Sequence, residues 1–176
     1  MARHDFDAAV REHQSAVFTF ASYLLRDRSE AEDATQEVLL KLWRHEHVLR
    51  DGNLLGWLMK VTRNACLDRL RSRRSAERVF SRSDLADFEA ACTSASPDPE
   101  QLAASSEIDY WLRHALSELA EPARSAVILR EVQGLAYREI CHALGMSLAN
   151  VKVSLHRARR KLRDRLREVY SDVSAA

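Results

Sequence analysis

Glycine, proline and cysteine are scarce in this chain of 176 residues, with 4, 3 and 3 copies respectively. So few glycines and prolines exclude the turn-rich β-sandwiches and barrels, and we expect a mostly helical protein. The cysteines, Cys66, Cys92 and Cys141, are odd in number and widely spaced, which argues against a disulfide framework and indicates a reducing cytoplasm. No apolar run reaches the roughly 18 to 20 residues of a membrane span, and no apolar signal-peptide segment follows the N-terminus.

Net charge is nearly absent as well, because 27 Lys and Arg oppose 26 Asp and Glu. The total hides an uneven distribution: residues 61–82 and 151–176 each carry +5, whereas 1–60 carry −2 and 83–150 carry −7. Dense basic blocks are candidate surfaces for a polyanion, since Lys and Arg release counterions from phosphates. A solvated helix face is the alternative for an isolated block, and the surrounding motifs must decide between the two.

Residues 81–106 predict a linker, because they are rich in Ser, Ala and Asp, hold two of the three prolines and show no helical periodicity. On either side we predict a small helical domain, residues 1–80 and residues 107–172. The expected fold class is therefore all-α, with two small helical domains joined by a flexible linker and a helix-turn-helix in the C-terminal one.

Three helices are expected in the N-terminal domain. Apolar residues recur at three- and four-residue steps over 6–24 and predict the first helix. Ser29 followed by Glu32 has the pattern of a capping box, so the second helix is expected to begin near Glu30. A third is expected over 54–74, ending in an arginine-rich stretch.

The C-terminal domain carries the pattern of a helix-turn-helix. Helices are predicted over 108–119 and 123–132, and a short helix over 137–144 ends at a glycine. Ser147 can then cap a long basic helix over 148–168. Two helices joined by a tight glycine-containing turn, the second of them basic, are typical of this DNA-binding motif.

The long basic helix has two distinct faces. Val151, Leu155, Ala158 and Leu162 recur at steps of four, three and four and mark its buried stripe. In a helix-turn-helix, residues near the start of the second helix contact base edges, and basic residues contact phosphates. The expected contacts to duplex DNA are Asn150, Lys152, Val153, Ser154, His156, Arg157 and Arg160, with Arg159 and Lys161 as further contacts to phosphates.

A family resemblance rests on residues 129–140 (LREVQGLAYREI), 144–147 (LGMS) and 151–162 (VKVSLHRARRKL). They resemble region 4 of the bacterial extracytoplasmic-function (ECF) sigma factors, which binds the −35 promoter element and contacts the β flap of RNA polymerase. Val153 and Ser154 stand where many members have Ser and Arg, and Ala149-Asn150 stands where Gly-Thr is common. Because arginine to guanine is the commonest specific contact, the −35 sequence itself stays open.

The second expected helix supports the same family. Residues 33–43 (DATQEVLLKLW) are similar to region 2.2, which docks on the clamp coiled coil of the polymerase β′ subunit. We expect Val38, Leu42 and Trp43 to face the domain core. The exposed face that this leaves for binding core polymerase consists of Asp33, Gln36, Glu37, Lys41 and Arg44.

The third expected helix resembles regions 2.3 to 2.4 over residues 57–71 (WLMKVTRNACLDRLR). In the family these regions open the −10 element and hold the non-template strand. Lysine and arginine side chains can bind phosphates, and the amide of an asparagine can hydrogen-bond to a base that has left the stack. We expect Trp57 to be a core aromatic residue. The expected −10 contacts are Lys60, Arg63, Asn64 and Arg71, together with Asn53 from the loop where the family captures a flipped base.

The resemblance implies an alternative sigma factor that is not an enzyme and needs no cofactor or metal. The implied partners are core RNA polymerase (β′ clamp coiled coil and β flap), promoter DNA and an anti-sigma factor. The implied location is the cytoplasm, with an anti-sigma factor able to hold the protein at the membrane. For the acidic linker, the resemblance implies a path through the active-site cleft towards the RNA exit channel, and a segment without function is the alternative.

Two other classes of function stay open at this stage. A stand-alone helix-turn-helix regulator would need a dimerisation or sensor domain and leaves residues 33–43 unexplained. An enzyme or metal site at His45 and His47 lacks the two-histidine i, i+4 geometry and a third ligand. The cysteines form no CxxC pair, and we expect Cys141 to pack within the helix-turn-helix.

Overall fold

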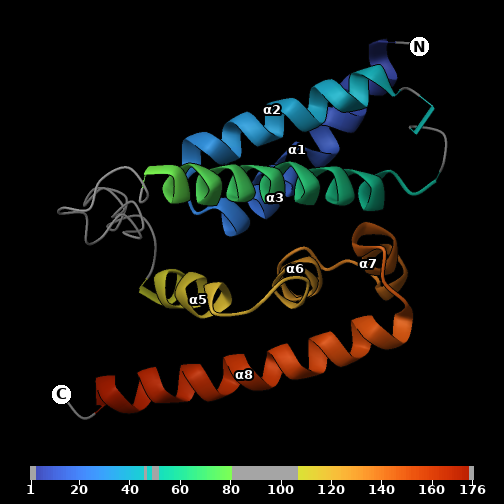
Figure 1. Ribbon diagram of the computed structural model, residues 1–176. Coiled ribbons are helices and arrows are strands. Elements are labelled where there is room, and N and C mark those ends of the chain that lie inside the picture. Colours follow the sequence, from blue (N-terminus) through green and yellow to red (C-terminus); the bar gives the residue numbers. More distant parts are fainter. Residues whose placement is uncertain (1–2, 46, 49–51, 81–106, 175–176) are drawn as a thin grey trace. The chain divides into compact units, whose positions relative to one another are not determined.

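The computed structural model describes residues 3–45, 47–48, 52–80 and 107–174. Every regular element within these ranges is a helix (Figure 1), which confirms the all-α prediction. The chain divides into two compact units, Met1–Ser96 and Pro97–Ala176. The linker predicted over 81–106, with Cys92 inside it, lies outside the described residues. None of the helices in the described ranges has both the length and the apolar composition needed to cross a membrane.

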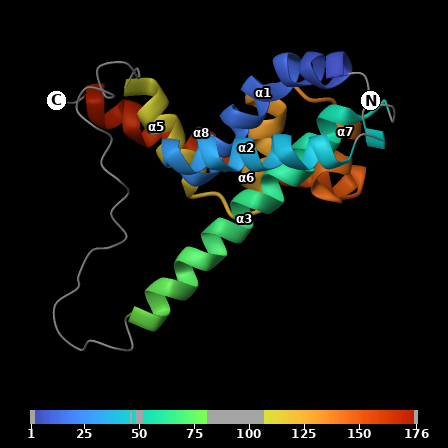
Figure 2. The same cartoon turned by 90° about the horizontal axis from the view of Figure 1, so that it is seen from above.

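Three helices build the first unit: α1 (Arg3–Leu25), α2 (Arg28–Arg44) and α3 (Leu54–Phe80). Each of the three packs against the other two. The C-terminal part of α3 extends beyond α1 and α2 (Figure 2). The largest fully buried side chains of this unit are Val17, Phe20 and Leu24 from α1, Val38 and Leu42 from α2, and Leu58 and Met59 from α3.

The start of α2 differs from the prediction, which placed the cap at Ser29. The N-cap is Asp27, whose Oδ1 accepts a hydrogen bond from the backbone N–H of Glu30 at 2.8 Å. Asp27 can cap because its backbone is extended (φ −121°), whereas Ser29 lies inside the first turn of the helix. Arg26, with φ of 60°, reverses the chain between α1 and α2 in the left-handed conformation that usually favours glycine.

Trp43 is not part of the core, and that prediction is wrong. Its side chain is 47% exposed and packs edge-on against Phe6 of α1, with ring centroids 4.9 Å apart. Val38 and Leu42 are buried as predicted. The apolar residues of α2 extend beyond its buried stripe, because Leu40 is also 58% exposed.

The second unit contains the remaining helical elements: α5 (Glu107–Ser117), α6 (Ala123–Val127), η2 (Ile128–Val132), α7 (Tyr137–Leu144) and α8 (Leu148–Ser174). The single helix predicted over 123–132 is therefore α6 continued by a π-helical turn. In that turn the N–H of Gln133 donates to the carbonyl of Ile128 at 3.1 Å, five residues earlier. The helices α5, α6 and α7 all pack on α8.

The predicted helix-turn-helix is present in α7, the connecting turn and α8. Gly145 ends α7 with φ of 65°, a left-handed conformation that glycine adopts without a Cβ clash. Ser147 then caps α8, because its Oγ accepts from the N–H of Asn150 at 3.3 Å. The predicted stripe of Val151, Leu155, Ala158 and Leu162 is buried. This burial fixes the rotation of α8 and therefore the residues that it presents outward.

The two candidate caps of α2 give a direct test of how this helix begins. Asp27→Ala is expected to lower the free energy of unfolding by about 1 kcal/mol, because it leaves the N–H of Glu30 without its side-chain acceptor. The matched variant Ser29→Ala is expected to leave it nearly unchanged. Urea denaturation followed by far-ultraviolet circular dichroism measures both, and a larger loss for Ser29→Ala would contradict capping by Asp27.

Candidate binding surfaces

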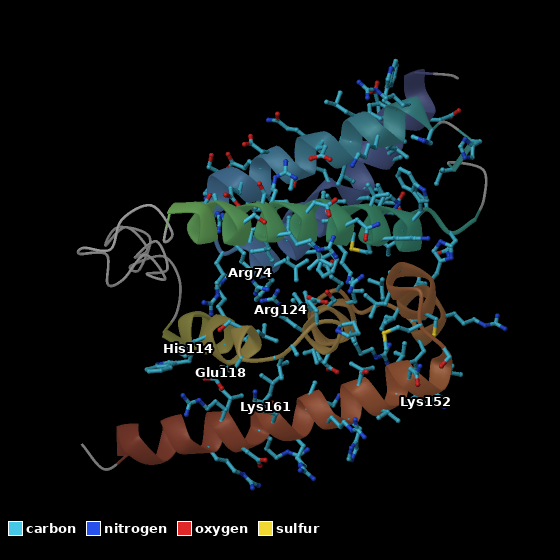
Figure 3. The ribbon with its side chains drawn as sticks, in the orientation of Figure 1. Arg74, His114, Glu118, Arg124, Lys152 and Lys161 are labelled. Carbon is cyan, nitrogen blue, oxygen red and sulfur yellow. The ribbon has the colours of Figure 1, made fainter. Side chains whose placement is uncertain are left out.

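The outward face of α8 holds the residues predicted to contact duplex DNA. This face lies opposite the buried stripe, and Lys152 marks its beginning near the N-terminus of the helix (Figure 3). Ser154 is half-buried at the edge of the face. The exposed members are Asn150, Lys152, Val153, His156, Arg157 and Arg160.

Two cations of α8 that were expected at phosphates have hydrogen-bond partners within their own unit. Arg159 donates to a carboxylate oxygen of Glu131 in η2 at 2.6 and 2.9 Å, and this hydrogen bond raises the pKa of the Arg159 guanidinium above its ordinary value. Lys161 donates to the backbone carbonyl of Glu118 at 2.7 Å (Figure 3). These two side chains therefore secure α8 to its own unit, whereas Arg157 and Arg160 face solvent.

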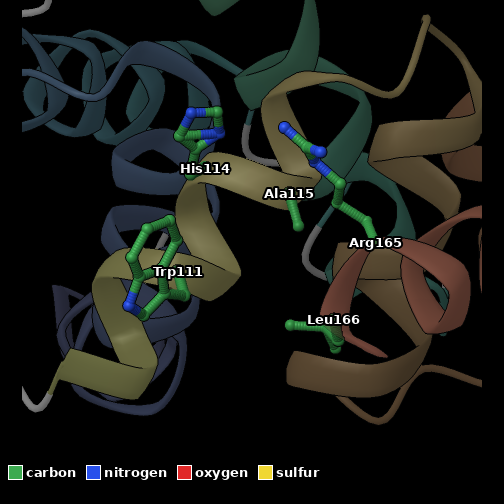
Figure 4. A pocket seen from close by; sticks show the side chains of 5 residues that line it. All are labelled: Trp111, His114, Ala115, Arg165 and Leu166. Carbon is green, nitrogen blue, oxygen red and sulfur yellow. The ribbon is translucent and has the colours of Figure 1, made fainter. Parts of the chain in front are cut away.

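A small hollow lies between α5 and α8, lined by Trp111, His114, Ala115, Arg165 and Leu166 (Figure 4). Its volume of about 20 Å³ has room for about one water molecule. This hollow is therefore too small to bind a cofactor or an organic ligand.

Charged residues of α2 and α3 pair across the first unit. Glu37 accepts from the Nζ of Lys41 at 2.6 Å and from the guanidinium of Arg69 at 2.8 Å. The hydrogen bonds from Lys41 and Arg69 hold the pKa of the Glu37 carboxyl below its ordinary value of 4.5, although partial burial opposes them. Arg73 and Glu30 form a second pair between the same two helices. Glu37 and Lys41, predicted as part of a partner-binding face, therefore already have partners inside the unit.

The rest of the predicted α2 face is open and has an apolar centre that the sequence reasoning missed. Asp33, Gln36 and Arg44 are exposed as predicted. Leu40 lies one turn from both Gln36 and Arg44, on the side opposite the buried residues of α2. The available signal was the run of Val38, Leu39, Leu40 and Leu42, which is more apolar than a single helix face can bury.

The arginine-rich part of α3 divides between two sides of the helix. Arg69 and Arg73 turn towards α2, where Glu37 and Glu30 accept their hydrogen bonds. Lys60, Asn64 and Arg71, at spacings of four and seven, lie on the opposite side and are exposed. Arg71 also donates to Asp68 at 2.9 Å. The structure thus brings three of the five predicted −10 contacts onto one exposed stripe.

The other two predicted −10 contacts lie elsewhere. Arg63 is half-buried and has contacts of its own within the structure. The side chain of Asn53 folds over the start of α3, and a Cβ on Gly56 would lie 2.5 Å from its Oδ1. A residue at this position closes the first turn of the helix, so Asn53 has a structural role beside its predicted one.

Trp57 and the neighbouring histidines form a ring cluster at the start of α3. Trp57 is half-buried, and its ring lies 6.0 Å from that of His45. The Nδ1 of His45 is 2.8 Å from the carbonyl of Lys41, and both His45 and His47 are exposed. Within the described residues no three His, Cys, Asp or Glu side chains gather in a group that could hold a metal ion. Among the cysteines that are described, Cys66 is buried and Cys141 is half-buried.

These surfaces define a class of protein: a two-domain helical nucleic-acid binder that presents one polar, basic face on α3 and another on a helix-turn-helix. Comparisons with known proteins narrow the class to a family. Residues 9–76 match Sigma-70 region 2, and residues 110–162 match Sigma-70, region 4.

Three relatives illustrate the similarity. The chain is 33% identical to the ECF RNA polymerase sigma factor SigE of Mycolicibacterium smegmatis, over 98% of its own length and 66%, about two thirds, of that of SigE. It is 30% identical to the RNA polymerase sigma factor CarQ of Myxococcus xanthus, over 98% of this chain and 95% of CarQ. It is 32% identical to the ECF RNA polymerase sigma factor SigL of Mycobacterium tuberculosis, over 90% and 86% of the two chains.

The chain belongs to the ECF sigma factors of RNA polymerase, so it is an alternative sigma initiation factor. Among solved structures it is similar to the sigma factor RpoE of Bartonella quintana, in complex with the anti-sigma factor NepR. That match has a TM-score of 0.71 and 26% identity and covers 93% of this chain and 97% of the other. The fold is also shared with CnrH, solved with the cytosolic domain of CnrY (TM-score 0.63, 21% identity).

The cluster of Glu37 with Lys41 and Arg69 makes the stability of the fold depend on pH. Glu37→Gln is expected to lower the free energy of unfolding by about 0.5 kcal/mol at neutral pH, a small effect because the cluster is partly exposed. Since the folded-state pKa of Glu37 is lowered, its contribution is present above pH 4.5 and is lost as the pH falls through that lowered pKa. Urea denaturation across this pH range measures the difference from the unmodified chain.

The matched control is Glu32→Gln, because the ion pair of Glu32 with Arg28 lies within α2. It is expected to cost less than Glu37→Gln at neutral pH. A stability difference for Glu37→Gln that grew as the pH fell would contradict the assignment.

Proposed function

We propose that residues 1–80 of this sigma factor bind core polymerase and the melted −10 element, and that residues 107–172 bind the −35 element as duplex DNA. Residues 81–106 connect the two. The observation that carries the proposal is that α3 and α8 each present cations and polar side chains on the side opposite their buried stripe. The protein supplies binding energy and no catalytic chemistry of its own, and it acts in the cytoplasm.

The −10 element is held along the exposed stripe of α3. Lys60 and Arg71 lie three turns apart on this stripe and bind phosphates of the separated strand on either side of Asn64. Asn64, between them, has an amide that can both donate to and accept from the edge of an unstacked base. Arg63, which is half-buried, and Asn53, which precedes α3, are the remaining predicted contacts.

The −35 element is held in its major groove by the outward face of α8. Asn150, Val153 and Ser154 lie near the start of the helix, where a recognition helix approaches base edges. The exposed cations that follow, Arg157 and Arg160, bind phosphates on either side of the groove.

Core polymerase docks on the exposed face of α2. An apolar residue surrounded by polar ones is the composition of a protein-binding centre with its rim, and Leu40 among Asp33, Gln36 and Arg44 has this composition. The partner for this face is the clamp coiled coil of β′, and the β flap is the partner for the C-terminal unit. Glu37 serves this face mainly by holding α2 against α3 through Arg69, and Lys41 supports Glu37 from within α2.

Regulation by an anti-sigma factor follows from the relatives. RpoE of Bartonella quintana is solved in complex with the anti-sigma factor NepR. We infer that a protein of this class covers the α2 and α8 surfaces of the present chain and keeps it from core polymerase. A membrane-bound anti-sigma factor would also hold the chain at the membrane.

In-vitro transcription with purified core polymerase tests the proposed function. The substrate is a pool of promoter fragments randomised over the −10 and −35 segments, and the expected result is specific initiation only when the chain is added. A chain that binds duplex promoter DNA tightly without core, and never supports initiation, would instead be a stand-alone regulator.

Leu40 tests the polymerase-binding face. Leu40→Ala is expected to weaken binding to core polymerase by about tenfold, because it removes roughly 1 to 2 kcal/mol of apolar contact at the centre of the face. Its effect on stability is expected to be small, since the side chain is largely exposed in the free protein. Fluorescence anisotropy of the labelled chain titrated with core measures the affinity.

Gln14→Ala, an exposed position on α1, is the control for Leu40→Ala and is expected to bind core normally. Equal core affinity for Leu40→Ala and the unmodified chain would remove Leu40 from the interface.

Asn64 tests strand separation. Asn64→Ala is expected to reduce open-complex formation on duplex promoters by about ten- to a hundredfold, the range for losing one or two hydrogen bonds to a base that has left the stack. Core affinity should stay unchanged, because Asn64 lies on α3 away from the exposed face of α2. Permanganate reactivity of unpaired thymines measures the opening.

Asn64 could act by promoting strand separation or by contacting the strand once it is open. A template with a pre-opened −10 segment distinguishes these two roles. If Asn64 contacts the open strand, holoenzyme with Asn64→Ala also binds this template more weakly than holoenzyme with the unmodified chain. Ser72→Ala, exposed further along α3, provides the control, and similar opening by both variants would argue against the role of Asn64.

A further inference from the structure

The centre of the outward face of α8 is apolar. Val153 is 48% exposed and lies on the side opposite the buried stripe of Val151 and Leu155. Ala149, one turn earlier on the same side, is exposed as well. An apolar side chain gains free energy when it leaves water for a nonpolar contact, so Val153 and Ala149 offer an apolar contact on this otherwise polar face.

The surroundings of Val153 identify the partner as DNA. Lys152, Arg157 and Arg160 are exposed around it, and this concentration of positive charge matches a phosphate backbone. Base edges in the major groove present mainly hydrogen-bonding groups, and the C5 methyl group of thymine is the one alkyl group among them. Because valine cannot donate or accept a hydrogen bond, thymine is the base that offers it the largest apolar contact.

We propose that Val153 reads a thymine methyl group in the −35 element, so that this sigma factor requires an A·T pair at a fixed position there. Ala149 lies one turn away and extends the apolar contact, and the amide of Asn150 matches the N6 and N7 groups of an adenine nearby. The proposal rests on the proposed function, because it concerns the bases that α8 selects.

The experiment compares thymine with deoxyuridine, which lacks only the C5 methyl group. Holoenzyme is assembled from core polymerase and the chain, and a promoter is selected from the randomised pool. Each thymine of its −35 segment, on either strand, is then replaced in turn by deoxyuridine. At one position we expect the holoenzyme concentration for half-maximal open-complex formation to rise about fourfold, the effect of one buried methyl group.

The variant Val153→Ser assigns this effect to the side chain. For this variant the thymine and deoxyuridine promoters are expected to behave alike, with a ratio of about one. Val132→Ser is the matched control, since Val132 is an exposed valine (39%) in η2, and it should keep the fourfold ratio.

Each other outcome overturns the proposal. If a holoenzyme that initiates specifically binds thymine and deoxyuridine promoters equally at every −35 position, Val153 does not contact a thymine methyl group. The proposed function would be unaffected by that result. A fourfold ratio that persists in Val153→Ser would show that the side chain serves some other contact, such as a protein partner. If no promoter in the pool supports initiation, the proposed function fails and this proposal fails with it.

Discussion

Burial of one apolar stripe sets the rotation of each long helix, and the binding surfaces of this sigma factor depend on that constraint. A fully buried leucine or phenylalanine contributes about 1.5 to 3 kcal/mol, whereas an exposed ion pair contributes about 0 to 1 kcal/mol. Packing therefore decides the orientation of the helices, and the charged side chains adjust to it. On α8 the buried stripe leaves Asn150 and Val153 outside, and on α3 it leaves Asn64 outside.

The same constraint explains how a nearly neutral chain keeps two basic surfaces. The basic block in α3 is partly neutralised, because Glu30 and Glu37 of α2 bind Arg73 and Arg69. The block in α8 loses Arg159 to Glu131 in the same way. What remains on each unit is a set of exposed cations, among them Lys60 and Arg71 on α3 and Arg157 and Arg160 on α8.

Several features could be predicted because they depend on local chemistry. The end of α7 and the start of α8 follow from Gly145 and Ser147, whose conformational preference and side-chain oxygen act within a single turn. The predicted cap of α2 was wrong for a related reason. Asp27 and Ser29 are both residues that cap helices well, and the backbone conformation of the loop selected Asp27. Arg26 gave no signal of its left-handed conformation, since it holds that conformation only because α1 and α2 pack on each other.

The sequence by itself determined the helical class, the helix-turn-helix and the buried stripe of α8, because periodicity and capping are encoded over a few residues. It also predicted the helices on which most of the candidate binding residues lie. Only the tertiary structure decided that Trp43 and Leu40 face outward, that Arg69 and Arg73 turn towards α2, and that Arg159 and Lys161 hold α8 to its own unit. The physical reason is that a side chain's partner often comes from another helix, and local patterns carry no information about which helix that is.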